Sequence, residues 1–329
     1  MTIGSGFDAR AALAAETASR APVDGHDGRS GARLERVVLT DGTRLVVKST
    51  DPAADLAMIV SEDRDGRELR LWRDGHLADL PPGVDHPIVD CWREVDGRIV
   101  TVMRDLGDAV ITWDRRLGPH DCARVLGAAA ALHRRFAGRA PDALCPLATY
   151  LTALAPPTVA PLAGGPNPLP GVILRGWERA AELVPAEVMD ALLGIFAEPW
   201  PLARALAAEG TTWVHGDLWP VNVALTPGDV TLLDWGLGVD GPAELDLATF
   251  LAGAASLAEE RRERLIAAYR RSGGRAGGAV LARSLLAVFG MYAWNKALDA
   301  AEHADPVIRR RERADLDWWV AQARTALML

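Results

Sequence analysis

The pattern of hydrophobic and polar positions divides the chain into a strand-rich first third and a helix-rich remainder. Residues 1–20 are Ala-rich and amphipathic, which predicts a helix. Further along, short Val- and Leu-rich runs alternate with polar residues, and Asp-Gly pairs at 41–42 and 96–97 separate consecutive runs. Asp-Gly between such runs is typical of a β-hairpin turn. Because only one more helix is predicted, over 61–73, residues 1–103 are expected to form a mostly antiparallel sheet.

Beyond residue 109 the apolar residues mostly recur at helical spacing, as in residues 120–137. The Pro- and Gly-rich stretch 153–172 predicts a surface connection. Apolar runs between 212 and 236 predict short strands around a Pro-Gly-Asp turn, and helices are expected from Leu245 onward. The pattern therefore predicts an α+β chain with a small β-rich N-terminal lobe (1–103), a hinge (104–108) and a larger helical C-terminal lobe (109–329).

Charge and composition disfavour several classes of partner. The formal net charge is -8 and no basic stripe occurs, which argues against nucleic acid. The longest apolar window, 285–294, is too short to span a membrane, and the first residues lack the pattern of a signal peptide. Three cysteines without CxxC spacing argue against a disulfide framework and a zinc site. We expect a cytoplasmic protein with no nucleic-acid partner, no membrane partner and no obligate protein partner.

The most informative segment is 215–236, which reads HGDLWPVNVALTPGDVTLLDWG. Asp217 follows an apolar run and could accept a hydroxyl proton as a general base. Asn222 and Asp234 offer amide and carboxylate oxygens, which are the ligands that Mg²⁺ prefers. One base and two metal ligands within a short hairpin are typical of phosphoryl transfer, where positioning and charge neutralisation do most of the catalysis.

Phosphoryl transfer also needs a cation for the phosphates. Lys48 ends the apolar run RLVVK, so its stem can follow a core strand while its ammonium faces a cleft. Glu68 is the expected partner of this lysine, with Glu62 as the rival. A Gly-rich stretch precedes the next strand, and its backbone N–H groups around Gly28, Ser30 and Gly31 could cap phosphates. A plain surface turn is the alternative interpretation of that stretch.

Three motifs together carry a resemblance to a known family: VHGDLWPVNVAL (214–225), LLDWG (232–236) and GPAELDLATFL (241–251). The run LGAAAALH (126–133) and the lysine of LVVK support them. With these motifs, over roughly two-thirds of its length, the chain resembles the aminoglycoside phosphotransferase and choline-kinase-like family. The resemblance implies a two-lobed protein-kinase-like fold, with a sheet and one helix in the first lobe.

The same resemblance implies a role for each matching residue. Asp217 would be the catalytic base, and Asn222 and Asp234 would hold Mg²⁺ against the β- and γ-phosphates of ATP or GTP. Lys48 would bind the α- and β-phosphates and be held by Glu68. His215 would brace the catalytic loop and Asp246 would anchor it, whereas His133 is expected to be structural. The adenine would meet the hinge backbone of Met103, Arg104, Asp105 and Leu106.

The acceptor is expected to be a small molecule rather than a peptide. The ELDLATF run follows Asp234 so closely that little chain remains to dock a peptide, which argues against a protein kinase. Trp219 could stack on the acceptor or fill the core. Acids beside aromatic rings suit a cationic acceptor. The other candidates for this pocket are Trp177, Glu178, Glu244, Tyr292, Trp294 and Asp299.

Several alternatives remain open from the sequence. Aminoglycosides, other antibiotics, amino sugars, sugars and amino alcohols are all compatible acceptors, with a role in resistance or in metabolism. A catalytically silent nucleotide-binding module and a structural interaction protein are the competing classes of function. Because Lys48, Asp217, Asn222 and Asp234 are all present, the sequence favours an active phosphotransferase.

Overall fold

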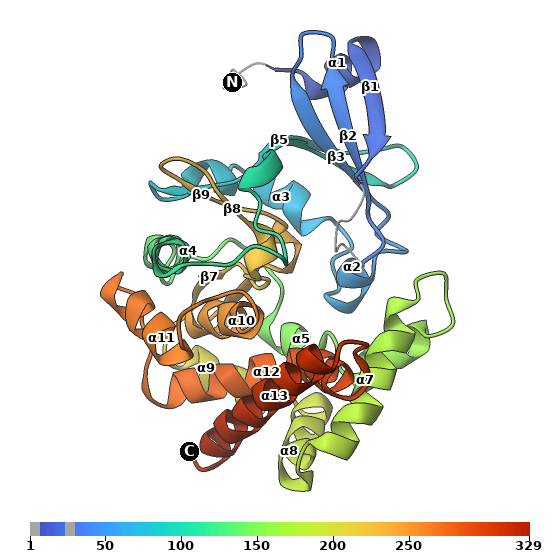
Figure 1. Cartoon of the computed structure of the whole chain (residues 1–329). Coiled ribbons are helices and arrows are strands. Elements are labelled where there is room, and N and C mark those ends of the chain that lie inside the picture. Colours follow the sequence, from blue (N-terminus) through green and yellow to red (C-terminus); the bar gives the residue numbers. More distant parts are fainter. Residues whose placement is uncertain (1–6, 24–29) are drawn as a thin grey trace.

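A five-stranded antiparallel sheet forms the N-terminal part of the molecule (Figure 1). The structure is a computed structural model, and it describes residues 7–23 and 30–329. The strand order is β1-β2-β3-β6-β5, and the two predicted Asp-Gly hairpins join β2 to β3 and β5 to β6. The strands are β1 (Thr17–Pro22), β2 (Arg33–Leu39), β3 (Arg44–Thr50), β5 (Ile88–Arg93) and β6 (Ile99–Arg104).

The prediction of one helix over residues 1–20 was wrong in its second half. Helix α1 covers only Ala9–Ala15, and the chain then enters β1, which pairs with β2 along the edge of the sheet. Ala9 and Ala12 are buried against the sheet, so packing stabilises this short helix. Most of β1 is exposed and it includes Pro22, which is tolerated at a sheet edge. Tertiary strand pairing therefore overrides the local helical preference.

The helix predicted over 61–73 is confirmed only in its second half, and a separate short helix ends just before the predicted range. Helix α2 covers Leu56–Val60 and helix α3 covers Arg67–Arg73. Gly66 caps α3 with a left-handed φ of 78°, a conformation that starts the helix later than the periodicity suggests. Helix α3 lies between the sheet and the rest of the molecule (Figure 1).

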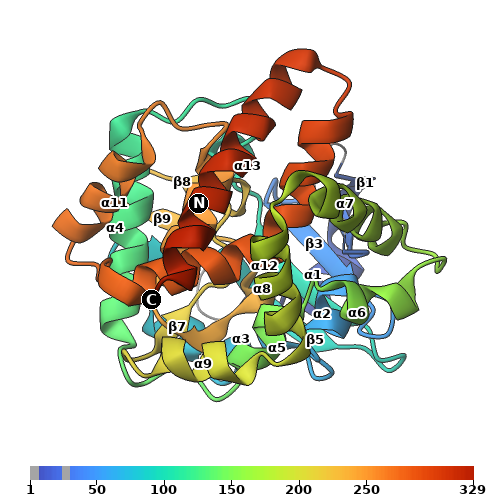
Figure 2. The ribbon, with the colours of Figure 1, turned by 90° about the horizontal axis from the view of Figure 1, so that it is seen from below.

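Helices dominate the chain after β6. Figure 2 shows the two longest helices, α12 and α13, side by side, and α7 and α8 lie next to this pair. The predicted surface connection 153–172 contains α6 and the first turn of α7, because proline is compatible with the first turn of a helix. The helices are α4 (Pro119–Arg135), α5 (Leu147–Thr152), α6 (Pro156–Val159), α7 (Leu169–Leu183), α8 (Ala186–Ala197), α9 (Trp200–Ala207), α10 (Glu244–Ala254), α11 (Arg262–Arg271), α12 (Gly278–Glu302) and α13 (Pro306–Leu327).

Two small sets of strands carry the segment 212–241 across the helical part. Strand β7 (Thr212–Val214) pairs with β10 (Val239–Gly241), and β8 (Val223–Leu225) forms a hairpin with β9 (Val230–Leu232). Strand β4 (Val84–Asp85) adds to β9 in parallel, so the two halves of the chain share a strand pairing. The boundary between lobes at 103–109 stays a prediction.

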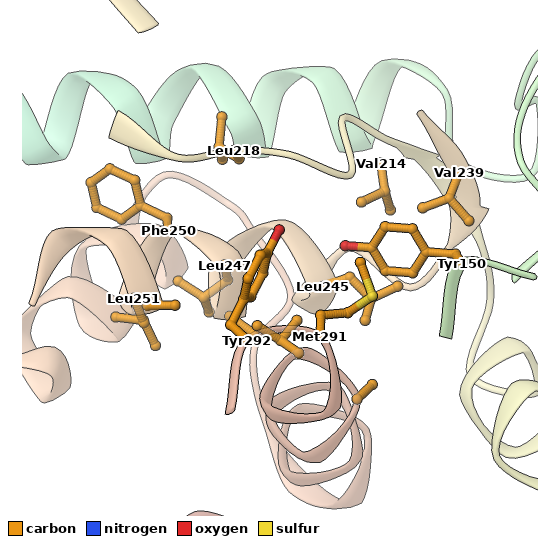
Figure 3. Close-up of a cluster of buried hydrophobic side chains, with 14 of the residues drawn as sticks. Tyr150, Val214, Leu218, Val239, Leu245, Leu247, Phe250, Leu251, Met291 and Tyr292 are labelled. Carbon is orange, nitrogen blue, oxygen red and sulfur yellow. The ribbon is translucent and has the colours of Figure 1, made fainter. Parts of the chain in front are cut away.

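The loop that follows β7 rests on a buried cluster from several elements. Figure 3 shows Leu218 of this loop above α10, with Tyr292 and Met291 of α12 on the other side of the cluster. Every residue of α10 is buried. The loop is therefore supported from below by tightly packed helices. In the part of the chain that the structure describes, no helix is long and apolar enough to cross a membrane.

Candidate active site

The loop after β7 has a shape that requires glycine at its second position. Gly216 has a φ of 81°, and a Cβ there would lie 2.0 Å from the carbonyl oxygen of Leu237. Its own carbonyl accepts a 2.8 Å hydrogen bond from the hydroxyl of Tyr150 on α5. The close approach and the left-handed backbone exclude a side chain at this position.

Asp246 of α10 anchors the same loop through its backbone. The carboxylate accepts the N–H of His215 at 2.8 Å and the N–H of Gly216 at 2.9 Å. It also lies 2.9 Å from Nε2 of His133, whose Nδ1 lies 2.7 Å from the hydroxyl of Tyr269. All of these groups are buried, where hydrogen bonds to a charged group are strong. The chain Tyr269–His133–Asp246 thus holds the loop from behind.

His215 and Trp235 form a second support. His215 is fully buried, its ring centroid lies 4.8 Å from that of Trp235, and its Nδ1 accepts the N–H of Asp217 at 3.4 Å. Burial lowers the pKa of His215, so the ring is neutral at neutral pH. Trp235 is also fully buried and donates its indole N–H to the carbonyl of Leu232. His215 therefore braces the backbone next to Asp217.

Asp217 is held through both of its carboxylate oxygens. Oδ2 accepts the side-chain amide of Asn222 at 2.7 Å, and Oδ1 accepts the hydroxyl of Tyr292 at 3.2 Å. Burial, and after it the charge of Asp234, raise the pKa of Asp217 to about 7. A carboxylate with a pKa near neutrality suits general base catalysis.

Asn222 faces Asp217 with its amide nitrogen. Nδ2 donates to the carboxylate and, at 3.0 Å, to the carbonyl oxygen of Asp217. The backbone carbonyl of Asn222 accepts the N–H of Leu233 at 2.8 Å, which joins the loop to the strand that leads to Asp234. Since both amide hydrogens point at Asp217, the amide oxygen points away from it and is available to a cation.

Asp234 leaves β9 with a left-handed backbone, at φ 59°. Such a conformation is uncommon for a residue other than glycine and is concentrated at functional sites. The side chain is half exposed, and its Oδ1 lies 2.9 Å from Nζ of Lys48. The positive charge of Lys48 lowers the pKa of Asp234, so the carboxylate is ionised.

Lys48 of β3 completes the cluster with Glu68 of α3. Nζ lies 3.5 Å from Oε2 of Glu68, which also accepts the hydroxyl of Thr101 at 3.2 Å. Burial lowers the pKa of Lys48, but Asp234 and Glu68 together raise it further, so the ammonium stays charged. The pairing is with Glu68 and not with the rival Glu62, which is exposed after the end of α2.

Arg67 is a buried residue at this site that the sequence pattern did not indicate. Its Nη1 donates to the carbonyl of Gly236 and its Nε donates to the carbonyl of Ala143 at 3.2 Å. These bonds fasten α3 to the Asp-Trp-Gly segment, so the positions of Glu68 and Asp234 are linked. A buried arginine is rare, and only its position beside Glu68 could have singled it out.

Side chains of the predicted hinge tie the end of β6 to its surroundings. Asp105 is buried and pairs with Arg36 at 2.8 Å and Arg44 at 3.1 Å. Arg104 donates to Asp85 at 2.6 Å, and Met103 is buried. Contact of adenine with Met103–Leu106 stays a prediction.

The predicted phosphate loop is described only in part. Gly28 lies outside the described residues. Ser30 and Gly31 lie between β1 and β2, and the carbonyl of Ser30 accepts the N–H of Leu56 and the side-chain amide of Asn167, both at 2.8 Å. Whether Ser30 and Gly31 contact phosphates stays a prediction.

A row of three aromatic rings leads from the surface to Asp217. Tyr292 and Trp219 meet edge to face with centroids 4.9 Å apart, and Trp219 meets Trp113 at 5.9 Å. The first ring, Trp113, is 44% exposed. Gly253 of α10 lets Trp219 approach, because a Cβ there would lie 2.6 Å from its ring. Trp113 was missed because an isolated tryptophan after the hinge carries no sequence signal.

The other predicted acceptor residues do not join this row. Trp177 donates to the carbonyl of Leu154 and packs on Phe196, and Trp294 donates to the carbonyl of Met291 within its own helix. Both rings are buried. Contact of either ring with an acceptor stays a prediction.

Three acidic residues that were predicted to line the acceptor pocket do not join the row of rings either. Glu178 is exposed on α7, and Asp299 is partly exposed near the end of α12. Glu244 is buried at the start of α10, where burial raises its pKa. Arg275 and His133 are among the charged and titratable groups near it, so Glu244 faces the support behind the loop.

Comparisons with known proteins bear on the family and the fold of this chain. The model of the phosphotransferase enzyme family (APH) matches residues 30–283. A search of curated proteins gave no match. The structure is similar to that of choline kinase LicA from Streptococcus pneumoniae, with a TM-score of 0.55 and 14% identity over 95% of this chain and 96% of that one.

Two further structures are similar at a TM-score of 0.50. An aminoglycoside phosphotransferase from Alicyclobacillus acidocaldarius is 15% identical over 99% of this chain and 98% of that one. A choline/ethanolamine kinase family protein from Mesorhizobium loti is 17% identical over 96% of this chain and 90% of that one. At these identities the likeness shows the fold, which is kinase-like. Because the family model covers most of the sequence, the chain belongs to the phosphotransferase enzyme family.

Proposed function

We propose that this phosphotransferase transfers the γ-phosphate of ATP or GTP to a hydroxyl group of a small acceptor, with Asp217 as the general base. The observation that carries the proposal is the Asp217 carboxylate. It is held through both oxygens, its pKa is raised to about 7, and it lies in the same cluster as Asp234 and Lys48. A base, an ionised carboxylate and a charged lysine at one site match the needs of phosphoryl transfer.

In the proposed reaction Asp217 takes the proton of the acceptor hydroxyl. The acceptor oxygen forms a bond to the γ-phosphorus, and the bond from that phosphorus to the bridging oxygen breaks, so the nucleoside diphosphate leaves with the electron pair. Lys48 is charged at every physiological pH, and the carboxylate of Glu68 lies 3.5 Å from its ammonium. Its ammonium would contact the phosphates of the donor, where it offsets negative charge.

Asn222 and Asp234 would hold Mg²⁺. The fit rests on the amide oxygen of Asn222, which points away from Asp217, and on the half-exposed carboxylate of Asp234. Two protein oxygens are enough, because Mg²⁺ keeps several waters and takes the remaining ligands from phosphates. When bound, the ion would neutralise charge on the transferring phosphoryl group.

The acceptor would reach Asp217 along the rings of Trp113, Trp219 and Tyr292. The exposed indole of Trp113 begins this row, and the ring of Tyr292 ends it beside the carboxylate of Asp217. Such a row suits a compact molecule that carries a ring or a cationic group. We infer an aminoglycoside-type antibiotic, an amino sugar, or a related sugar or amino alcohol. Three buried, unbridged cysteines support a reducing compartment, and we place the protein in the cytoplasm.

A magnesium-dependent screen tests the proposal. ATP and GTP consumption is measured over aminoglycosides, macrolides, amino sugars, neutral sugars and amino alcohols, with wild type and Asp217→Asn. Asp229→Asn is the matched control, because Asp229 is exposed in the turn between β8 and β9. We expect turnover with one acceptor class, and we expect Asp217→Asn, but not Asp229→Asn, to abolish it. A wild-type protein that binds nucleotide and turns over no acceptor would indicate a silent nucleotide-binding module.

A further inference from the structure

All three tyrosines of the chain direct their hydroxyls at the catalytic loop or at its support. The hydroxyl of Tyr150 donates to the carbonyl of Gly216, and that of Tyr269 lies against His133, which bonds to Asp246. Only Tyr292 reaches the side chain of Asp217. Figure 3 shows the hydroxyls of Tyr150 and Tyr292 pointing inward toward the segment between Val214 and Leu218.

The ring of Tyr292 is buried and packed against neighbouring side chains. The residue is 8% exposed, in the middle of the buried helix α12. Trp219 packs edge to face against its ring at 4.9 Å, and Leu247 and Met291 lie beside it in the cluster of Figure 3. Burial and the charge of Asp217 raise the pKa of Tyr292, so the phenol stays protonated and acts as a donor.

We propose that Tyr292 is a positioning residue for the base: its hydroxyl holds Oδ1 of Asp217 while Asn222 holds Oδ2, and together they fix the plane of the carboxylate toward the acceptor. An ionised carboxylate has about four acceptor positions, so these two donors leave room for an acceptor hydroxyl. The inference rests on the proposed function, because it assigns Tyr292 a part in the proton transfer to Asp217.

The physical reason for a second donor is the freedom of the aspartate side chain. The torsion that rotates a carboxylate is broad and has no sharp minima. Asn222 alone fixes one oxygen and allows the other to swing. Since small errors in the position of a catalytic group cost large factors in rate, a second bond from a rigid ring has a use in catalysis that packing alone does not provide.

The chain offers a matched pair of variants. Tyr292→Phe keeps the ring and removes the bond to the carboxylate, whereas Tyr150→Phe removes a hydroxyl bond of the same kind to the backbone of the same loop. With the acceptor found in the screen, we expect Tyr292→Phe to lower kcat about tenfold while the KM values for acceptor and nucleotide stay within about twofold. Unchanged kcat in a folded Tyr292→Phe protein, or a raised acceptor KM with unchanged kcat, would overturn the inference.

A double-mutant cycle in thermal unfolding needs no acceptor and separates this inference from the proposed function. We expect the changes in Tm for Tyr292→Phe and Asp217→Ala to be non-additive, and those for Tyr150→Phe and Asp217→Ala to be additive. Additive changes for the Tyr292 pair would overturn the inference whatever the screen shows. If Asp217→Asn abolishes wild-type turnover but Tyr292→Phe leaves kcat unchanged, only the inference about Tyr292 is refuted. If no acceptor in the screen is turned over, but the changes in Tm for Tyr292→Phe and Asp217→Ala are non-additive, only the proposed function is refuted.

Discussion

The raised pKa of Asp217 predicts a steep dependence of activity on pH. An ordinary aspartate has a pKa of 3.8 and would be fully ionised above about pH 5, which would give a flat profile near neutrality. With a pKa of about 7, the ionised fraction of Asp217 rises from about one tenth at pH 6 to about nine tenths at pH 8. Because only the ionised carboxylate can accept the proton, kcat/KM should increase about ninefold across this range.

The assay is kcat/KM between pH 5.5 and 9 at constant ionic strength and saturating magnesium, with the acceptor found in the screen. We expect a single ionisation on the acidic limb, and we expect Asp217→Asn to show no turnover at any pH in this range. His215 braces the loop beside Asp217, and its pKa is lowered below its usual range, so its ionisation falls at lower pH. A wild-type profile that is flat between pH 6 and pH 8 would refute the reasoning.

The same pKa fixes the sign of an effect on stability. Between pH 3.8 and about 7 the folded protein keeps the proton on Asp217, whereas the unfolded chain has lost it. Unfolding therefore releases a proton, and this contribution to stability is complete below about pH 4 and is lost as the pH rises through about 7. Asp217→Asn should remove that part of the pH dependence in denaturant unfolding, and an identical dependence in wild type and variant would contradict the assignment.

Three further predictions concern single side chains. Gly216→Ala should lower the free energy of unfolding, measured in urea, by about 3 kcal/mol or more, because it adds a clash to a left-handed backbone. Gly228 has a φ of 94° and open space around it, so Gly228→Ala should cost only about 1 kcal/mol. Equal losses for the two variants would contradict the argument. Of the two lysines in the chain, Lys48→Met should abolish nucleotide-dependent stabilisation in a melting assay and keep the fold. By contrast, Lys296→Met should lower the free energy of unfolding by about 1–3 kcal/mol, because it removes a buried cation from Glu312 and Asp315 and leaves them only Arg311 and Arg262. A Lys296→Met protein as stable as wild type would show that these charges are not paired as described. Trp113→Ala should raise the acceptor KM about tenfold at unchanged nucleotide KM. Trp200 on α9 is also exposed, and Trp200→Ala should change neither constant. An unchanged acceptor KM for Trp113→Ala would remove Trp113 from the acceptor path.

Local chemistry explains why much of the architecture could be predicted. The two Asp-Gly turns, the β2–β3 and β5–β6 hairpins and the helix after Pro119 depend on residues that are close in sequence. The catalytic segment is also compact, so Asp217, Asn222 and Asp234 are brought together by a hairpin of little more than twenty residues. Interactions over such short separations are encoded in the local pattern.

The start of the chain shows where the local pattern fails. The predicted helix covered residues 1–20, but Thr17–Pro22 extend the sheet because β2 offers an edge to pair with. The break at Gly66 similarly depends on a backbone conformation that apolar periodicity does not report. In both places a single φ value or a distant hydrogen-bond partner outweighs propensities of a few tenths of a kcal/mol per residue.

By itself the sequence determined the class of chemistry at the site: a base, two oxygen ligands and a lysine on a strand. Only the tertiary structure decided which other side chains hold these groups in place. It pairs Lys48 of β3 with Glu68 of α3, places Asp246 and His133 behind the loop, and puts Tyr292 rather than Trp177 or Trp294 against Asp217. These partners lie many residues apart on different helices, and which face of a helix meets the loop is set by packing of the whole core. Residue type and spacing carry the chemistry, whereas the support and selectivity of the site depend on how the helices pack.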